Sequence, residues 1–323
     1  DIGRDRHRFT RPRDDAQSNY DRGGHGGGYR LPLEEQIHQL ADCHIHHAGA
    51  LGCCGGDLHH LGLQVADPPA CVCALAHYWS RDHWGVHRLW AHRSYDAHWT
   101  VRVFMMLINS MANQGSIYHW SRDHRVHHKH SEQDADPHNA TRGFFFAHMG
   151  WLYVKKHPAV IKAGRTLDFS DLEADPVVMF QDNLDPWFAW FMCFILPALI
   201  GKHAWGEGFW NAFWVAGALR FCAVLHFTWL VNSAAHMFGD HPYDHKSWPS
   251  ENPFVSICAI GEGWHNWHHK YPFDYAASEF GVGHQFNPTK MFIDGLAAVG
   301  LVTNRKRATG AWAKLAERRD KEE

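Results

Sequence analysis

The sequence predicts an all-α integral membrane protein with a histidine-rich cytosolic cap, and two features of the chain support this fold class. The first is a pair of long apolar segments, residues 187–200 and 209–235, which only a short turn at residues 201–208 separates. With its flanks, each segment approaches the length that a helix needs to cross a bilayer. The second is a set of histidines that recur at helical spacing before and after this pair. We therefore expect a transmembrane hairpin that carries a metal-binding cap.

Tryptophans near the ends of the two apolar segments favour a membrane location, because such side chains gather where a bilayer meets water. They are Trp187, Trp190, Trp205, Trp210 and Trp214. The alternative is a pair of buried helices in a soluble α-domain, since the first segment is short and contains Pro197. Basic residues flank the hairpin on the histidine side, which is typical of cytoplasmic segments. These are Lys155, Lys156, Arg305, Lys306 and Arg307.

The histidine spacing predicts a metal site. In residues 261–269 three histidines stand at i, i+3 and i+4, so a helix brings them onto one face, and the same spacing occurs at residues 124–128. With a looser pair upstream, the set is His87, His92, His124, His127, His128, His265, His268 and His269. Neutral imidazole suits iron, zinc, copper and nickel, whereas calcium and magnesium prefer oxygen. So many imidazoles fit two transition metals better than one.

Composition excludes some functions and divides the chain. A formal net charge of -3 over 323 residues leaves no cationic footprint for a nucleic acid. The cysteines form no disulfide framework, which suits a reducing compartment. Residues 1–85 mix Arg, Asp, His and Gly with no sustained period, which is typical of disorder or irregular coil. Residues 86–304 carry the histidines and the hairpin, and residues 305–323 form a charged tail.

With its histidine clusters placed around a hairpin, the chain resembles the membrane-bound acyl-CoA desaturases of the stearoyl-CoA Δ9 type. The resemblance runs from about residue 85 to about residue 304 and rests on specific motifs. They include His87-Arg88-Leu89-Trp90-Ala91-His92, Arg122-Asp123-His124-Arg125-Val126-His127-His128-Lys129, Asp134-Ala135-Asp136-Pro137-His138-Asn139, Asn232-Ser233-Ala234-Ala235-His236 and residues 261–269.

The resemblance implies a di-iron centre bound by nine histidines, the eight above and His236, with Asn232 holding a metal-bound water. All nine act as ligands and none as a general base. It also implies that Thr228 and Trp229 line the bend of an acyl tunnel. Basic residues should meet the phosphates of CoA, namely Arg122, Lys155 and Lys156. Three departures from the family pattern stand near the expected CoA site and the second cluster: Gly115-Ser116 for Asn-Asp, His119 for Glu and His130 for Phe.

The implied activity is the insertion of a cis double bond, at the Δ9 position, into a saturated long-chain fatty acyl-CoA in unsaturated fatty acid biosynthesis. The reaction uses dioxygen and two electrons, which cytochrome b5 and its reductase supply. The implied location is the endoplasmic reticulum membrane, with the histidine clusters and the C-terminus in the cytosol. Two alternatives stay open: a fatty acyl hydroxylase on a similar histidine scaffold, and a non-catalytic metal-binding or metal-transport membrane protein.

Carboxylates near the clusters could orient the imidazole rings through their far nitrogens. Asp123, Glu262 and Asp240 are the candidates. Each also has an ordinary interpretation as a surface charge.

The first quarter of the chain lacks the two further spans that the family has before its first histidine cluster. The end of the second span is a Gly-Leu-Gly-Ile-Thr-Ala-Gly-like run. If the codons of residues 82–86 are GAT CAC TGG GGT GTG, one inserted C and a shifted frame give Ile-Thr-Ala-Gly-Val. We therefore hypothesise that residues before about Gly85 are a frameshifted translation of a desaturase N-terminus. The chain as written would then lack two helices that should wall the acyl tunnel, and an inactive chain with every metal ligand present is one expected outcome. The rival is a divergent, disordered segment.

Overall fold

The structure is a computed structural model that describes residues 85–322, all within the compact unit Leu40–Glu323. Residues 1–84 therefore lie outside the described residues. They include nearly all of the predicted N-terminal part and most of the residues that the reading-frame hypothesis concerns. Of the predicted boundaries, only those at residues 86, 304 and 305 fall in the described part of the chain.

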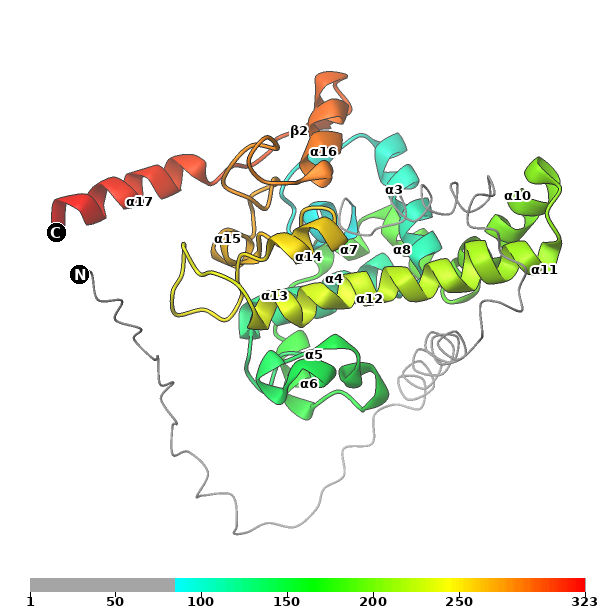
Figure 1. Cartoon of the computed structure of the whole chain (residues 1–323), viewed down its shortest axis with the longest axis horizontal. Helices are drawn as coiled ribbons and strands as arrows, with labels where there is room; N and C mark the ends of the chain where they lie inside the picture. The colour runs from blue at the N-terminus through cyan, green and yellow to red at the C-terminus, as the bar shows by residue number, and fades with distance from the viewer. Residues whose placement is uncertain (1–84, 323) are drawn as a thin grey trace, which may run out of the picture. The chain divides into compact units, whose positions relative to one another are not determined.

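The described residues are mostly helical, which confirms the predicted fold class (Figure 1). The elements of the cap before the hairpin are η3 (Val86–Ala91), β1 (Asp96–Ala97), α3 (Trp99–Ala112), α4 (Ile117–His130), η4 (Ala140–Arg142), α5 (Phe144–His148), η5 (Gly150–Tyr153), α6 (Pro158–Gly164), α7 (Ser170–Glu173) and α8 (Pro176–Leu184). The hairpin contains α9 (Trp187–Trp190), η6 (Phe191–Ile195), α10 (Leu196–Trp205), α11 (Phe209–Ala212), η7 (Phe213–Leu219), α12 (Arg220–Asn232) and α13 (Ala234–Met237). The elements after it are α14 (Pro253–Cys258), α15 (His265–Lys270), α16 (Pro288–Ala298), β2 (Val302–Thr303) and α17 (Thr309–Glu322).

Within residues 85–322 two helices are long and apolar enough to cross a membrane, Trp187–Trp205 and Phe209–Met237, with mean hydropathies of 1.3 and 1.5. The first extends past the predicted end at residue 200, because α10 continues until Gly206 ends it in a left-handed conformation. Pro197 fits here because it lies at the start of α10, directly after the π-helical turn η6. Large apolar side chains face outward along the hairpin, with Trp187 72% and Trp210 68% exposed. An outward apolar surface favours lipid over the interior of a soluble domain.

The two spans pack closely because glycine faces its neighbour at two places. A Cβ on Gly201 would meet the Ala212 side chain at 2.7 Å, and one on Gly217 would lie 3.3 Å from the Phe194 backbone. Small residues let helix backbones approach in a membrane. Arg220 is buried in the second span and donates to the carbonyl oxygens of Ala216 and Cys193 at 2.8 Å each, so its charged group has acceptors there.

The cap has its own hydrophobic core, which holds the first two histidine-bearing segments together. Buried side chains of η3, α3, α4, α8 and α16 form it, among them Trp90, Met105, Ile117, Val178 and Ile293. The antiparallel pair of β1 and β2 is the one sheet among residues 85–322, and the sequence did not predict it. The predicted tail forms α17, and Trp312 at its start packs near Tyr243 and Trp267, so the tail is not wholly solvated.

Candidate metal centre

Among residues 85–322, nine histidines converge in two groups, and they come from η3 and the residue that follows it, α4, α13 and α15. In each group one ring nitrogen per residue lies within 4.8 Å of every other. The first group is His87, His92, His124, His128 and His268, and the second is His127, His236, His265 and His269. Every histidine that the sequence and the resemblance nominated as a ligand is among them. Their role as ligands stays a prediction.

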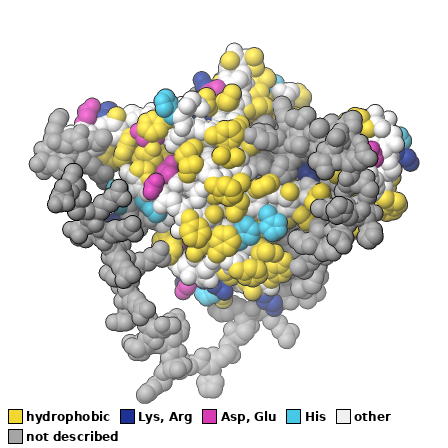
Figure 2. Space-filling model, in the orientation of Figure 1, with side chains coloured by type: hydrophobic (Ala, Val, Ile, Leu, Met, Phe, Trp, Pro, Cys, Tyr) yellow, Lys and Arg dark blue, Asp and Glu magenta, His cyan; other side chains and the backbone are white. Residues whose placement is uncertain are grey.

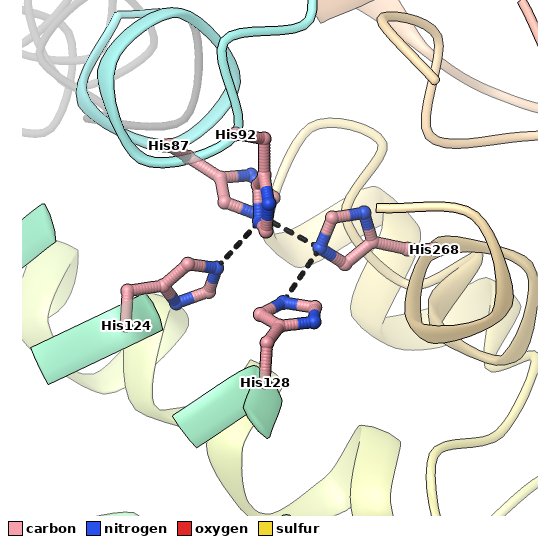
Figure 3. A group of neighbouring side chains, drawn as sticks. All are labelled: His87, His92, His124, His128 and His268. Carbon is pink, nitrogen blue, oxygen red and sulfur yellow. Dashed lines mark hydrogen bonds between the residues drawn. The ribbon is translucent and has the colours of Figure 1, made fainter. Parts of the chain in front are cut away.

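In the first group the Nε2 atoms point toward one another (Figure 3). The Nε2–Nε2 distance is 2.8 Å from His92 to His124, 3.0 Å from His87 to His268 and 3.1 Å from His268 to His128. This convergence of imidazole nitrogens from three motifs is what a nitrogen-binding transition metal requires.

The second group repeats the arrangement around His265. Its Nε2 lies 3.0 Å from Nε2 of His236 and 3.1 Å from Nε2 of His269. The ring of His127 completes the group, with centroid distances of 5.0 Å to His236 and 5.1 Å to His269. The rings of His128 and His269 stack at 4.1 Å, so the two groups are adjacent.

In the first motif His87 and His92 face the same site because η3 is a π-helix. Residues five apart on an α-helix point roughly 140° away from each other. The wider turn, in which the His92 amide donates to the His87 carbonyl at 3.1 Å, instead brings the rings of His87 and His92 to 4.8 Å. Single π-turns are frequent at functional sites.

The third motif depends on its two glycines. Gly261 has φ of +107°, which favours glycine. A Cβ on Gly263 would collide with the Asn252 carbonyl and the Ser256 backbone, because the chain enters α15 through a tight crossing. The Oε1 atom of Glu251 then accepts from the Trp267 amide at 2.8 Å and fixes the first turn of α15.

Three carboxylates contact the Nδ1 atoms of the converging rings. Glu262 lies 3.0 Å from His87, Asp136 lies 2.9 Å from His127 and Glu132 lies 2.5 Å from His236. A carboxylate at Nδ1 fixes the tautomer and leaves Nε2 free to bind a metal.

Of the three carboxylates that the sequence suggested for this role, only Glu262 has it. The prediction for Asp123 is wrong, because its carboxylate bonds Lys156 at 2.5 Å and Arg122 at 3.3 Å. The backbone of Asp240 pairs with that of Glu251 in an isolated β-bridge. Within residues 85–322 its carboxylate contacts no histidine. The sequence did not indicate this role for Asp136 or Glu132, although Asp136 stands in a motif on which the resemblance rests.

Burial lowers the pKa of most of the converging histidines well below the usual range, and the neighbouring imidazoles lower it further. These are His92, His124, His128, His265, His268 and His269. They are therefore neutral, which is the form that binds a metal. His127 differs: burial would lower its pKa, but Asp136 outweighs burial and raises it.

The other predicted site residues lie around this centre. Asn232 is the last residue of α12, four positions before His236. The Thr228 hydroxyl accepts from the Gln114 amide at 3.1 Å, and Trp229 is buried beside it. Arg122 and Lys156 flank Asp123, while Lys155 is exposed.

The three departures from the family pattern have local contacts. The Ser116 hydroxyl caps α4 by accepting from the His119 amide at 3.2 Å. The His119 ring lies 3.8 Å from the Asp182 carboxylate, and Nδ1 of His130 lies 3.5 Å from the Gln133 side chain. None of these three residues is among the two converging groups.

Burial raises the electrostatic cost of leaving Asp123 charged, but the ammonium of Lys156 and the guanidinium of Arg122 outweigh it and hold the pKa of Asp123 well below its usual range. One carboxylate therefore stands between two of the three cations that the resemblance assigns to phosphate binding.

Comparison with known proteins agrees with this geometry. The family model described as Fatty acid desaturase matches residues 65–281. Stearoyl-CoA desaturase 5 of Bos taurus is 57% identical over 225 residues, which cover 70% of this chain and 67% of the relative. The human protein of the same name is 56% identical, with 70% and 68% covered. The human stearoyl-CoA desaturase is 54% identical over 227 residues, with 70% and 63% covered.

Proposed function

The chain belongs to the fatty acid desaturase family, and on that premise we propose that it desaturates a saturated long-chain fatty acyl-CoA, with a cis double bond formed at Δ9. The substrate loses two hydrogens, and dioxygen takes up these with two electrons and two protons to give two waters. The observation that carries the proposal is the convergence of nine imidazoles from three motifs in two adjacent groups.

The donor set fits two irons. Histidines of the first group would hold one iron and those of the second group the other, with Asn232 holding a water on one of them. When bound, the irons would supply from dioxygen an oxidant strong enough to remove hydrogen from an unactivated methylene. The convergent Nε2 atoms and the carboxylates behind three of the rings support this assignment.

The chain's own residues orient the ligands. Glu262 is 1% exposed and accepts from both Nε and Nη2 of Arg88, which in turn donates to the carbonyls of Tyr275 and Ala276. This network holds the carboxylate that faces His87. A buried, hydrogen-bonded support of this kind fixes the ligand geometry before substrate arrives.

The substrate would be held by cations at one end and apolar side chains at the other. Arg122, Lys155 and Lys156 are proposed to bind the phosphates of CoA, with Asp123 offsetting part of their charge. Thr228 and Trp229 are proposed to form the bend of the acyl tunnel. Both lie within the second span, near the end that leads to His236.

The proposed partners are cytochrome b5 and its reductase as electron donors. The proposed location is the endoplasmic reticulum membrane, with the histidine cap and the C-terminus in the cytosol. The two apolar helices and the relatedness to stearoyl-CoA desaturases support a membrane protein.

Product analysis tests the proposal. The purified chain, as printed and with its reading frame restored, is given stearoyl-CoA, dioxygen, NADH, cytochrome b5 and its reductase. We expect a monounsaturated 18-carbon product with a cis bond at Δ9 from at least the restored form. A hydroxylated product would favour the hydroxylase instead, and bound metal without any product would favour a metal-binding protein.

A further inference from the structure

A contacting histidine pair lies outside the two converging groups and has no part in the proposed chemistry. His148 ends α5 in the cap, and His226 lies in α12 within the second span. Nε2 of His148 is 3.0 Å from Nδ1 of His226, and Nδ1 of His148 is 3.0 Å from the Ser233 hydroxyl. Figure 2 shows histidine side chains amid apolar ones on the face that α12 crosses. Ionisable groups in a span are costly, which makes this pair a candidate functional feature.

The direction of the hydrogen bonds follows from the single proton of the serine. The Ser233 hydroxyl donates to the Trp229 carbonyl at 2.8 Å, so it accepts from Nδ1–H of His148. Burial, with His226 beside it, lowers the pKa of His148 to about 4, so this imidazole is neutral. Its Nε2 then accepts from Nδ1–H of His226. The hydrogen bonds therefore run from His226 to His148, then to Ser233, and end at the carbonyl oxygen of Trp229.

Both imidazoles also pack edge-on against the Trp229 ring. The centroid distance is 5.7 Å at an angle of 78° for His148 and 5.3 Å at 77° for His226. Trp229 as a whole is 4% exposed. It also packs in an apolar cluster with Phe194, Phe221 and Leu225, and this cluster joins the two spans. Its ring and its carbonyl are therefore held by the same two-histidine network.

We propose that His148 and His226 are positioning residues that hold the Trp229 ring in one orientation and thereby set which pair of methylenes is desaturated. This inference rests on the proposed function, in which Trp229 lines the bend of the acyl tunnel. A tunnel wall must separate positions that differ by one methylene, a discrimination worth about 10–200-fold in an apolar pocket. If the Trp229 ring could tilt, the tunnel would lose part of this discrimination between neighbouring methylene positions.

Substitutions at the less buried member, His226, separate the hydrogen bond from the volume of the ring. In His226→Asn the amide N–H can replace the donor to His148, whereas His226→Leu removes it. The matched control is His203→Asn, at an exposed histidine of α10. The parent is whichever form, as printed or frame-restored, gives product. Iron per chain and the unfolding midpoint are measured for every variant, because the inference concerns selectivity and predicts no loss of metal.

The expected readout is the ratio of positional isomers formed from stearoyl-CoA. Product with the bond displaced by one carbon should rise about tenfold in His226→Leu and stay near the parent level in His226→Asn and His203→Asn. A parent-like ratio in His226→Leu at full iron content would overturn the inference. Equal disturbance in His226→Asn and His226→Leu would overturn the role of the hydrogen bond. Absence of product from both parent forms would instead overturn the proposed function and this inference with it.

Discussion

The two groups of histidines are supported in different ways. Within residues 85–322 one carboxylate, Glu262, contacts a ring nitrogen of the first group, whereas Asp136 and Glu132 contact two rings of the second. The first group has five imidazoles, three of them partly exposed, and the second has four, of which only His269 is partly exposed. Metal binding in the first group should therefore depend mainly on its number of imidazoles. In the second group it should depend more on the carboxylates that contact the Nδ1 atoms.

Because the two groups are supported differently, we expect their metal binding to respond differently to substitution. Glu262 also neutralises Arg88, so a change there disturbs the fold and the first group together. Asp136 serves His127, and the raised pKa of that histidine reflects the carboxylate beside it. Loss of Asp136 should weaken the second group without unfolding the cap.

Removal of one central ligand from either group should have the largest effect. His268→Ala takes an imidazole from the first group and His265→Ala takes one from the second. We expect each to lower iron from two per chain toward one and to reduce desaturation to background. Elemental analysis and product assay check this, with His245→Ala, at an exposed histidine, as the control. If either variant kept full iron and full activity, that histidine would be no ligand.

Glu262→Gln should give the next largest effect. Arg88 and Glu262 are each 1% exposed in their side chains and lie 2.5 Å apart. The substitution leaves a buried guanidinium without its counter-charge, which costs about 3–5 kcal/mol. Thermal unfolding should show a large loss of stability, together with loss of iron from the first group. Parent-like stability would show that the carboxylate does not hold Arg88 in the folded chain.

Glu251 should make stability depend on pH, because it fixes the start of α15, which carries ligands of both groups. Burial raises the pKa of Glu251 from 4.5 to about 8. Hydrogen bonds from the backbone amides of Trp267 and Asn266 lower this pKa, but burial outweighs them. Between these values the folded chain binds the proton and the unfolded chain has released it, so stability falls as pH rises through this window. Glu251→Gln should remove this fall and melt several degrees above the parent at pH 8, with little difference at pH 5. A parent with no loss of stability between pH 5 and 8 would contradict the assignment.

Asp136→Asn tests the second group alone. The carboxylate holds Nδ1 of His127 at 2.9 Å and also accepts from the backbone amides of Glu132 and His138. Losing a carboxylate behind a ligand typically costs 10–100-fold in metal affinity or activity. We expect a loss in that range by chelator competition, with the first iron retained. Equal loss of both irons would show that the two groups are one coupled site.

The smallest effect is expected at Asp123, which lies outside both groups. Its ion pair with Lys156 is partly exposed, and such pairs contribute about 0–1 kcal/mol. Asp123→Asn should leave stability and iron unchanged. It should lower the KM for acyl-CoA, because Lys156 and Arg122 lose a competing anion. A higher KM would argue that Asp123 positions these cations for the phosphates.

Local spacing predicted eight of the nine histidines, and α4 and α15 each present three of them as helical spacing requires. His236 came only from the resemblance, because no spacing links it to the other histidines. The pair His87 and His92 did not fit α-helical spacing, and only the π-turn of η3 explains it. The carboxylates Asp136 and Glu132 escaped prediction because their contacts depend on which way each Nδ1 points, and tertiary packing decides that. The histidine pair beside Trp229 joins residues 78 positions apart, which no local pattern reveals.

The hairpin was predicted from the length of its apolar segments and the tryptophans near their ends, and its first helix ends later than expected. Residues 201–205 are polar enough to suggest a turn, yet α10 continues through them to the left-handed Gly206. The short pairing of Asp96 with Thr303 likewise carried no sequence signal, because two-residue strands have no period to read.

The metal content of the purified chain tests the proposed di-iron centre. Purified chain, as printed and with its frame restored, is analysed for iron, zinc and other transition metals after expression in iron-supplemented cells. We expect two irons per chain, with X-ray absorption showing nitrogen ligation at both. Zinc as the bound metal, or a chain without metal in both forms, would contradict it.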